Sequence, residues 1–146
     1  MLVQEISADN FLGLYISYVF ISNNKKYYIY NIKEIAMFYV LKKENSQTVN
    51  NIIDTKNCVC FYYWVNCGHC HQMMPTWMKL CKDYGKDVNI INIELADIQY
   101  LNPQSRNIMG FPTIMSYKNG IKKEEFNGSR DYDSLEKFLM KSKILT

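Results

Sequence analysis

The chain has little of what marks non-globular and membrane proteins. Among its 146 residues are only six glycines and three prolines, which excludes collagen-like and linker-dominated sequence. No basic run exceeds a pair of lysines and the net charge is only +3, so nothing indicates binding to nucleic acid. The longest apolar stretch, residues 11–21, is about half as long as a membrane-spanning helix, which needs roughly 20 residues. A globular domain without a membrane span is therefore expected.

The sequence also lacks a secretory signal. Glu5 and Asp9 precede the apolar stretch, no Lys or Arg does, and no small-residue cleavage site follows it. We therefore expect a cytoplasmic protein by default. The chain is rich in Tyr, Asn, Ile and Lys, as low-G+C genomes produce. If that genome belongs to a large DNA virus, the expected location is the virion or the viral factory.

The cysteines do not form the even, scattered set of a secreted disulfide scaffold. There are five, and all of them lie within residues 58–81. Clustering of this kind in an apparently intracellular chain indicates redox catalysis or metal binding.

A polar segment at residues 42–47 divides the chain near residue 45. We expect residues 1–45 to be an N-terminal extension and residues 46–146 to be the main domain. In the extension, residues 14–22 and 27–32 are predicted strands, and residues 35–41 could be a helix or a strand. Nine of the aromatic residues fall here, so the extension is either a small layer on the main domain or an interaction surface, including one for homodimerisation.

The main domain is predicted to alternate helices and strands. We expect a short helix at 48–54, a fully buried strand at 58–64, a helix that follows Cys70 and ends at Gly85 with Pro75 inside it, and a strand at 88–95. A further helix is predicted at 97–109, with Asp97 as its N-cap and Pro103, near its start, as a candidate break.

The last part of the chain is predicted to be a hairpin and a helix. The Asn119-Gly120 pair is a strong hairpin signal between strands at 113–117 and 121–126, and Asp131 or Asp133 can cap the final helix. Parallel strands joined by helices and followed by a hairpin predict a three-layer α/β fold with a mixed central sheet.

The motif Cys67-Gly-His-Cys70 carries the chemistry. Two cysteines three apart, where a strand passes into a helix, can close a disulfide by a small movement. The first thiol lies at the helix N-terminus, where free N–H groups and the helix dipole stabilise a thiolate, so Cys67 is the candidate nucleophile. Cys70, one turn further on, is suited to attack a mixed disulfide. His69 can stabilise the thiolate further, whereas His71 is more typical of a solvated helix residue.

The sequence around this motif resembles the active-site region of protein disulfide isomerase domains. The resemblance rests on Phe61-Tyr-Tyr-Trp-Val-Asn-Cys-Gly-His-Cys70 with Pro75 and Trp77 after it, on Met109-Gly-Phe-Pro-Thr113, and on the segments 117–120 and 126–130. It covers residues 46–146 and implies a thioredoxin-like fold. It also implies a protein that exchanges disulfides with thiol- or disulfide-containing proteins and carries no cofactor beyond a Cys67–Cys70 disulfide.

The resemblance implies a role for several residues. Cys67 corresponds to the attacking thiol, Cys70 to the resolving thiol and His69 to the residue that tunes the redox potential. Pro112 corresponds to the family's cis-proline, and the backbone of Phe111 to a binding edge for an extended peptide. Arg130 corresponds to an arginine that assists the resolving thiol, although a surface cation at a turn is an equally good interpretation.

Two residues depart from the family pattern. Asn66 stands where the family has a Trp before the first cysteine, and the neighbouring Trp64 is the residue that could replace the lost aromatic contact with substrates. Phe61 stands where the family buries a carboxylate that moves protons for the resolving thiol. General-base assistance is worth roughly 10²–10⁴-fold, so we expect slow turnover.

Three functions follow as hypotheses. The first is a thiol–disulfide oxidoreductase that leans towards oxidation or isomerisation, with a mixed disulfide on Cys67. The second is a peptide- or protein-binding module with little or no turnover, which Phe61 and Asn66 favour. The third is a metal site on Cys67, Cys70 and His71, for which a single pair of cysteines supplies only half of a four-ligand set. Cys58, Cys60 and Cys81 are predicted to be buried free thiols.

Overall fold

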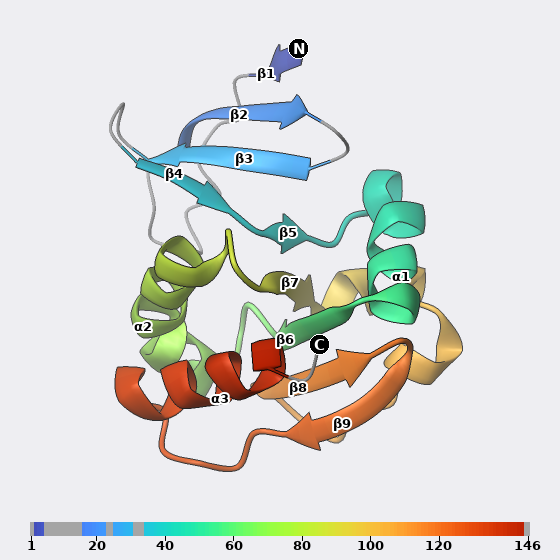
Figure 1. Ribbon diagram of the computed structural model, residues 1–146, viewed down its shortest axis with the longest axis vertical. Coiled ribbons are helices and arrows are strands. Elements are labelled where there is room, and N and C mark those ends of the chain that lie inside the picture. Colours follow the sequence, from blue (N-terminus) through green and yellow to red (C-terminus); the bar gives the residue numbers. More distant parts are fainter. Residues whose placement is uncertain (1, 5–15, 23–24, 31–33, 145–146) are drawn as a thin grey trace.

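A mixed five-stranded sheet forms the centre of the protein (Figure 1). The computed structural model describes residues 2–4, 16–22, 25–30 and 34–144. The strands of this sheet, in spatial order, are β5 (Tyr39–Val40), β7 (Asn89–Glu94), β6 (Asn57–Tyr63), β8 (Thr113–Lys118) and β9 (Ile121–Glu125). β5 and β6 run parallel to β7, whereas β8 is antiparallel to both β6 and β9. The predicted mixed sheet is confirmed.

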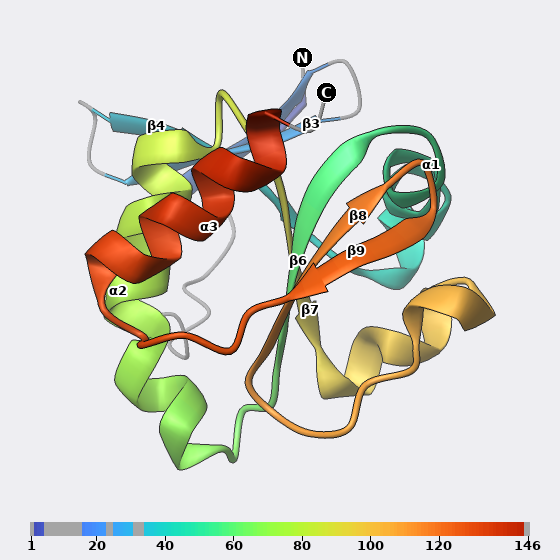
Figure 2. The same cartoon turned by 60° about the horizontal axis from the view of Figure 1, so that its bottom comes forward.

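Helices cover both faces of this sheet, as the two views show (Figure 2). α1 (Ser46–Thr55) packs on one face, and α2 (Gly68–Tyr84) and α3 (Tyr132–Ile144) pack on the other. The central strand β6 shows why, because successive side chains of a strand point to opposite faces. Its residues Cys58, Cys60 and Tyr62 join the core beneath α1. Its residues Val59, Phe61 and Tyr63 join the core beneath α2 and α3. The three-layer α/β fold follows from this double burial.

Helix α2 carries a wide apolar face along most of its length. Its buried residues are Cys70, Met73, Met74, Trp77, Met78, Leu80 and Cys81. Trp77 is completely buried, and its indole N–H donates to Asn92 Oδ1 over 2.7 Å, which satisfies both polar groups inside the core. The helix ends at Gly85, as predicted.

The helix predicted at 97–109 is wrong. Residues Leu95–Tyr100 and Pro103–Ser105 form two 3-10 helices, η3 and η4. The N-cap is Glu94 rather than Asp97, because the Glu94 carboxylate accepts from the N–H of Ala96. Between the two turns, Asn102 is bonded to α1 through Asn50, so a long-range contact overrides the local helical pattern.

The predicted hairpin and final helix are confirmed. Asn119 and Gly120 both have positive φ, 50° and 78°, which the tight turn between β8 and β9 requires. The turn also binds the end of α1, since the N–H of Gly120 donates to Ile53 O. Asp131 begins α3 by accepting from the N–H of Ser134. Hydrogen bonds from the Ser129 side chain and from Ser134 lower the pKa of Asp131 to about 2.

The N-terminal part contains a second, antiparallel sheet in the order β1 (Leu2–Gln4), β2 (Ile16–Ser22), β3 (Lys25–Tyr30) and β4 (Glu34–Met37). The strands predicted there are confirmed, and β4 settles residues 35–37 as strand. Residues 14–15 and 31–32 of the predicted strands lie outside the described residues, and β3 begins at Lys25, two residues before the predicted start. β5 joins the main sheet, so residues 39–40 belong to the main fold. Two expectations stay predictions: that residues 1–45 are a separate extension, and that they mediate homodimerisation.

No helix within the described ranges has both the length and the apolar composition needed to cross a membrane.

The hairpin turn generates a stability prediction. Gly120→Ala places a Cβ on a residue with φ of 78°, and we expect it to lower the free energy of unfolding by about 1 kcal/mol. Gly110→Ala is the matched control, because an added Cβ at Gly110 meets open space. Urea unfolding of the two variants measures the difference. Equal midpoints would show that the positive φ at Gly120 does not matter to stability.

Candidate active site

Cys67 occupies the point where the central strand passes into α2. It is the N-cap of the helix, with an extended backbone, and its Sγ accepts the N–H of Cys70 over 3.2 Å. The backbone of the same residue is bonded on both sides, to Trp64 O and to the N–H of His71. The thiol is half-buried rather than enclosed. Free N–H groups and the positive end of the helix dipole therefore face a sulfur that a second protein can reach.

The loop that contains Pro112 lies against this cysteine. The Phe111–Pro112 peptide bond is cis, and Cys67 Sγ is 3.6 Å from Phe111 O. The thiol can donate to this carbonyl, whereas a thiolate cannot, so the contact changes when the cysteine ionises. The fold thus brings together two sequence-predicted site segments that are 44 residues apart.

Cys70 lies one turn behind Cys67 and has no exposed surface. Burial is the main cause that raises the pKa of its thiol to about 12, and the hydrogen bond with the Cys67 side chain raises it further. At neutral pH only about one such thiol in 10⁵ is ionised. Cys70 is therefore a weak nucleophile in the dithiol form that the structure describes.

The core that contains Cys70 holds the aromatic side chain of Phe61 rather than an acidic one. Phe61 has no exposed surface and belongs to the same core cluster as Cys70. Its ring lies between those of Trp77 and Tyr63, with centroid separations of 4.9 Å and 5.5 Å. The buried polar side chains in the described part of the chain include no carboxylate and no imidazole, so no buried side chain there can act as a base for Cys70.

The loop before Cys67 forms an exposed rim. Trp64, Val65 and Asn66 are all exposed, and the first two leave 39% of their surface uncovered. His71 Nε2 lies 2.6 Å from Val65 O, so this histidine holds the rim in place instead of being merely solvated. His69 is exposed on the first turn of α2, close to the thiol in sequence.

Arg130 shares a cavity with Pro112. It is exposed, and both residues line a cavity of about 230 Å³ together with Met73. The positive charge of Arg130 lowers the pKa of Cys70, although burial outweighs it. Arg130 is thus the cation that acts on the resolving thiol from outside the core.

Met109 belongs to the site and was missed by sequence reasoning. It leaves 97% of its surface exposed, three residues before the cis-proline. Phe111, whose carbonyl contacts Cys67, follows two residues later, and a large apolar side chain so fully exposed in this loop suits contact with another protein. One feature of the sequence could have indicated it: an apolar residue directly precedes the Gly-Phe-Pro loop.

The other cysteines are buried free thiols, as predicted. Burial raises the pKa of Cys60 and of Cys81, so neither reacts readily. No three His, Cys, Asp or Glu side chains come together as a metal site among the described residues.

Comparison with known sequences points to one family. The sequence profile described as thioredoxin matches residues 30–141. The chain is 30% identical over 113 residues to a protein disulfide-isomerase of Saccharomyces cerevisiae, covering 76% of this chain and 21% of that protein. It is 29% identical over 86 residues to a thioredoxin domain-containing protein 5 homolog of Drosophila melanogaster, covering 55% and 20%. The chain thus spans about a fifth of the length of these relatives.

Solved structures show the same fold. A J-Trx1 fragment of ERdj5 superposes with a TM-score of 0.61 at 20% identity, covering 73% of this chain and 52% of the fragment. A thioredoxin of Malassezia sympodialis superposes with a TM-score of 0.59 at 20% identity, covering 73% and 93%.

The different burial of the two thiols generates a reactivity prediction. At pH 8, iodoacetamide should add one group rapidly to the folded, reduced protein, at Cys67. Cys70 should react far more slowly, and its rate should rise with pH up to about 12, because its raised pKa keeps it protonated until then. Intact mass and peptide mapping measure both rates. Cys67→Ser should abolish the rapid addition, and rapid labelling of Cys70 at pH 7 would contradict the burial argument.

Proposed function

Because the chain belongs to the thioredoxin family, we propose that it is a thiol–disulfide oxidoreductase that exchanges disulfides with client proteins through a mixed disulfide on Cys67. One observation supports this above all. The Cys67 sulfur lies at the N-terminus of α2, receives a backbone N–H, and is reachable beside the cis-Pro112 loop. A thiolate is stabilised there while its partner thiol lies within one turn.

The exchange proceeds in two displacements. In the oxidising direction, a client thiolate attacks Cys67 in the Cys67–Cys70 disulfide, the bond between the cysteines breaks, and Cys70 leaves and takes up a proton. A second client thiolate then attacks the client sulfur of the mixed disulfide and releases Cys67 as a thiolate. Two electrons pass from the client to the protein, and the client gains one disulfide.

The burial of Cys70 favours one branch of this chemistry. A thiol with a pKa near 12 is both a poor leaving group and a poor attacking group, so net oxidation and net reduction are slow in both directions. Isomerisation needs only Cys67, which attacks a client disulfide and is later displaced by another client thiolate. We therefore propose isomerisation as the faster activity, with protein clients held by the exposed apolar side chains of Trp64, Val65 and Met109.

A binding module with little turnover is the second candidate. The enclosed Cys70 and the Phe61 aromatic stack favour it, because they hinder completion of the redox cycle. Cys67→Ser separates the two functions. It abolishes exchange under the first and leaves client binding intact under the second.

The redox equilibrium with glutathione tests the proposed function. We expect a Cys67–Cys70 disulfide with a potential near about −180 mV, as in disulfide isomerases. Alkylation followed by intact mass at a series of glutathione ratios measures it, with Cys81→Ala as a control that keeps both active-site thiols. A potential of about −270 mV would indicate a reductant instead. Failure to form the disulfide at any ratio would overturn the two-displacement oxidoreductase cycle, although isomerisation through Cys67 alone does not need that bond.

Phe61 generates a second test. Phe61→Glu places a carboxylate beside Cys70, and we expect it to accelerate conversion of a Cys67–glutathione mixed disulfide into the Cys67–Cys70 disulfide by roughly 10²-fold. Phe61→Gln is the matched control, because it has the same size and polarity change without a base. Acid quenching and mass spectrometry follow the conversion, and circular dichroism checks that both variants fold. Equal rates in the two variants would show that proton transfer does not limit resolution.

A further inference from the structure

A tight turn connects the end of β6 to Cys67. It spans residues 64–67 and is closed by a hydrogen bond from the N–H of Cys67 to Trp64 O over 3.0 Å. This bond leaves the N–H and the carbonyl of Val65, a central residue of the turn, to be bonded by other parts of the chain. The shape of the rim, residues 64–66, therefore depends on what Val65 meets.

Two ionisable side chains from different elements bond Val65. His71, in the first turn of α2, places its Nε2 2.6 Å from Val65 O. Because a carbonyl oxygen only accepts, this ring nitrogen carries a proton and donates it. On the other side, the N–H of Val65 donates to Glu94 Oε1 in a long hydrogen bond of 3.5 Å. The second oxygen of that carboxylate accepts from the N–H of Ala96 and so caps η3. The turn is thus attached to α2 through its carbonyl and to the end of β7 through its N–H.

The attached turn carries an apolar surface that leads directly to the nucleophile. Trp64 and Val65 each leave 39% of their surface exposed, and Leu95 leaves 41%. Tyr63 and Glu94 are the last residues paired between β6 and β7, so Trp64 and Leu95 follow at the same end of two adjacent parallel strands. Exposed apolar side chains grouped in this way suit contact with the apolar side chains of another protein.

We propose that His71 and Glu94 are positioning residues, which hold the rim in the shape that selects clients with apolar side chains next to their cysteine. This role rests on the proposed function, because it concerns which disulfides reach Cys67. Neither side chain needs to touch the reacting sulfur atoms. Their hydrogen bonds fix the rim before a client arrives, so less conformational freedom is lost on binding and more of the apolar contact contributes to affinity.

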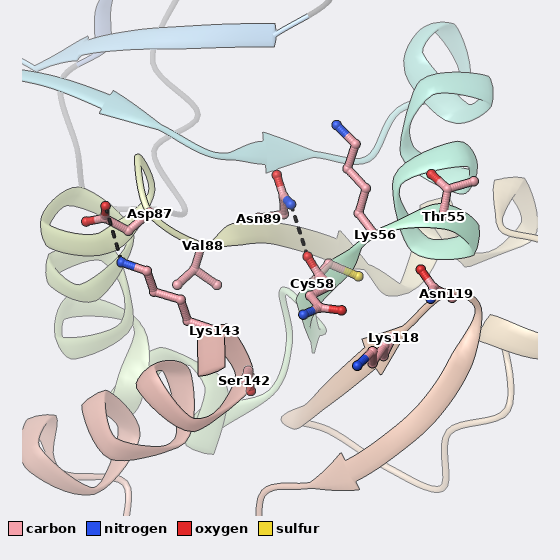
Figure 3. A pocket seen from close by; sticks show the side chains of 11 residues that line it. Thr55, Lys56, Cys58, Asp87, Val88, Asn89, Lys118, Asn119, Ser142 and Lys143 are labelled. Carbon is pink, nitrogen blue, oxygen red and sulfur yellow. Dashed lines mark hydrogen bonds and ion pairs between the residues drawn. The ribbon is translucent and has the colours of Figure 1, made fainter. Parts of the chain in front are cut away.

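A matched contact at the opposite end of β6 provides a control. There the side-chain amide of Asn89 donates to Asn57 O over 3.0 Å, as the dashed line in Figure 3 marks. Like the His71 contact, it joins a side-chain N–H to a backbone carbonyl at one end of this strand. Because β6 spans seven residues, the two contacts lie about 20 Å or more apart. Asn89→Ala therefore removes the same kind of hydrogen bond as His71→Ala but leaves the rim intact.

Two peptide disulfides test the proposal. Each is the disulfide-linked dimer of a short peptide, with leucine and phenylalanine beside the cysteine in one and glycine and serine in the other. In a Cys70→Ser background, the Cys67 thiolate attacks one peptide sulfur, forms a mixed disulfide and releases the other peptide as a thiolate. Intact mass follows the product. We expect the rate constant to be about tenfold higher for the apolar peptide.

Variants assign this preference to the two side chains. His71→Ala should reduce the preference from about tenfold to about twofold, while the rate for the polar peptide stays within about twofold. His71→Gln should restore most of it, because its amide can donate to Val65 O as the imidazole does. Glu94→Leu should also reduce the preference, whereas Glu94→Gln keeps an acceptor oxygen and should retain it. Asn89→Ala should leave it unchanged.

Several results would overturn the proposal. Equal rate constants for the two peptides with intact His71 and Glu94 would show that the rim does not select clients. Equal slowing of both peptides by His71→Ala would place the effect of His71 on the thiol instead of on the rim. Loss of the preference in Asn89→Ala would reveal a general effect of destabilisation.

Failure of the proposed function would look different, because no mixed disulfide would then form with either peptide. In that case, non-covalent binding of the same peptides with serine in place of cysteine decides the positioning role. The chain has two tryptophans and Trp77 is completely buried, so tryptophan fluorescence reports binding at Trp64. Tighter binding of the apolar peptide that is lost in His71→Ala would support the role, and equal binding of both peptides would overturn it.

Discussion

The burial of β6 on both faces is the constraint on which the rest of the structure depends. Its two sets of side chains enter two separate cores, so neither α1 nor the pair α2 and α3 can leave the sheet without exposing one set to water. The candidate active site is an extension of this strand. Cys67 follows its last residue after a short exposed loop. A rigid strand thereby fixes the position of the thiol, while the loop beyond it remains accessible.

The same constraint explains the chemical character of the resolving thiol. Complete burial of a Phe side chain stabilises the fold by about 1.5–3 kcal/mol, and each aromatic pair adds about 0.5–1.5 kcal/mol. Phe61 has both kinds of stabilisation, because it is fully buried and its ring packs against those of Trp77 and Tyr63. A carboxylate at this place would need a partner or a raised pKa to remain in the core. The core around Cys70 is therefore stable but offers no route for its proton, and the exposed Arg130 is the charge that remains to favour its thiolate.

Much of the fold and the central part of the site could be predicted from sequence, because their signals are local. The apolar run of β6, the apolar face of α2, the Asn119-Gly120 turn and the Cys67-Gly-His-Cys70 motif each act within a few residues. What could not be predicted depends on distant partners. The segment after β7 has a helical pattern, but Asn50 of α1 holds Asn102 and divides it into two short turns. The exposure of Met109 and the two hydrogen bonds that hold Val65 likewise result from how separate elements meet.

The two cysteines of the motif differ in environment far more than their spacing suggests, and this difference determines which reaction is easy. Thiol–disulfide exchange is fastest when the attacking thiol is ionised and the leaving thiol is acidic. Cys67 is accessible at the helix N-terminus, whereas burial encloses Cys70 and raises its pKa, so Cys70 fails these conditions. Under the proposed function, steps that use only Cys67 are therefore the faster ones, and steps that make or break the Cys67–Cys70 bond wait for Cys70 to lose or gain a proton. A mixed disulfide with a client would persist long enough for another client thiol to displace it. Such a lifetime favours rearrangement of client disulfides over their net formation or reduction.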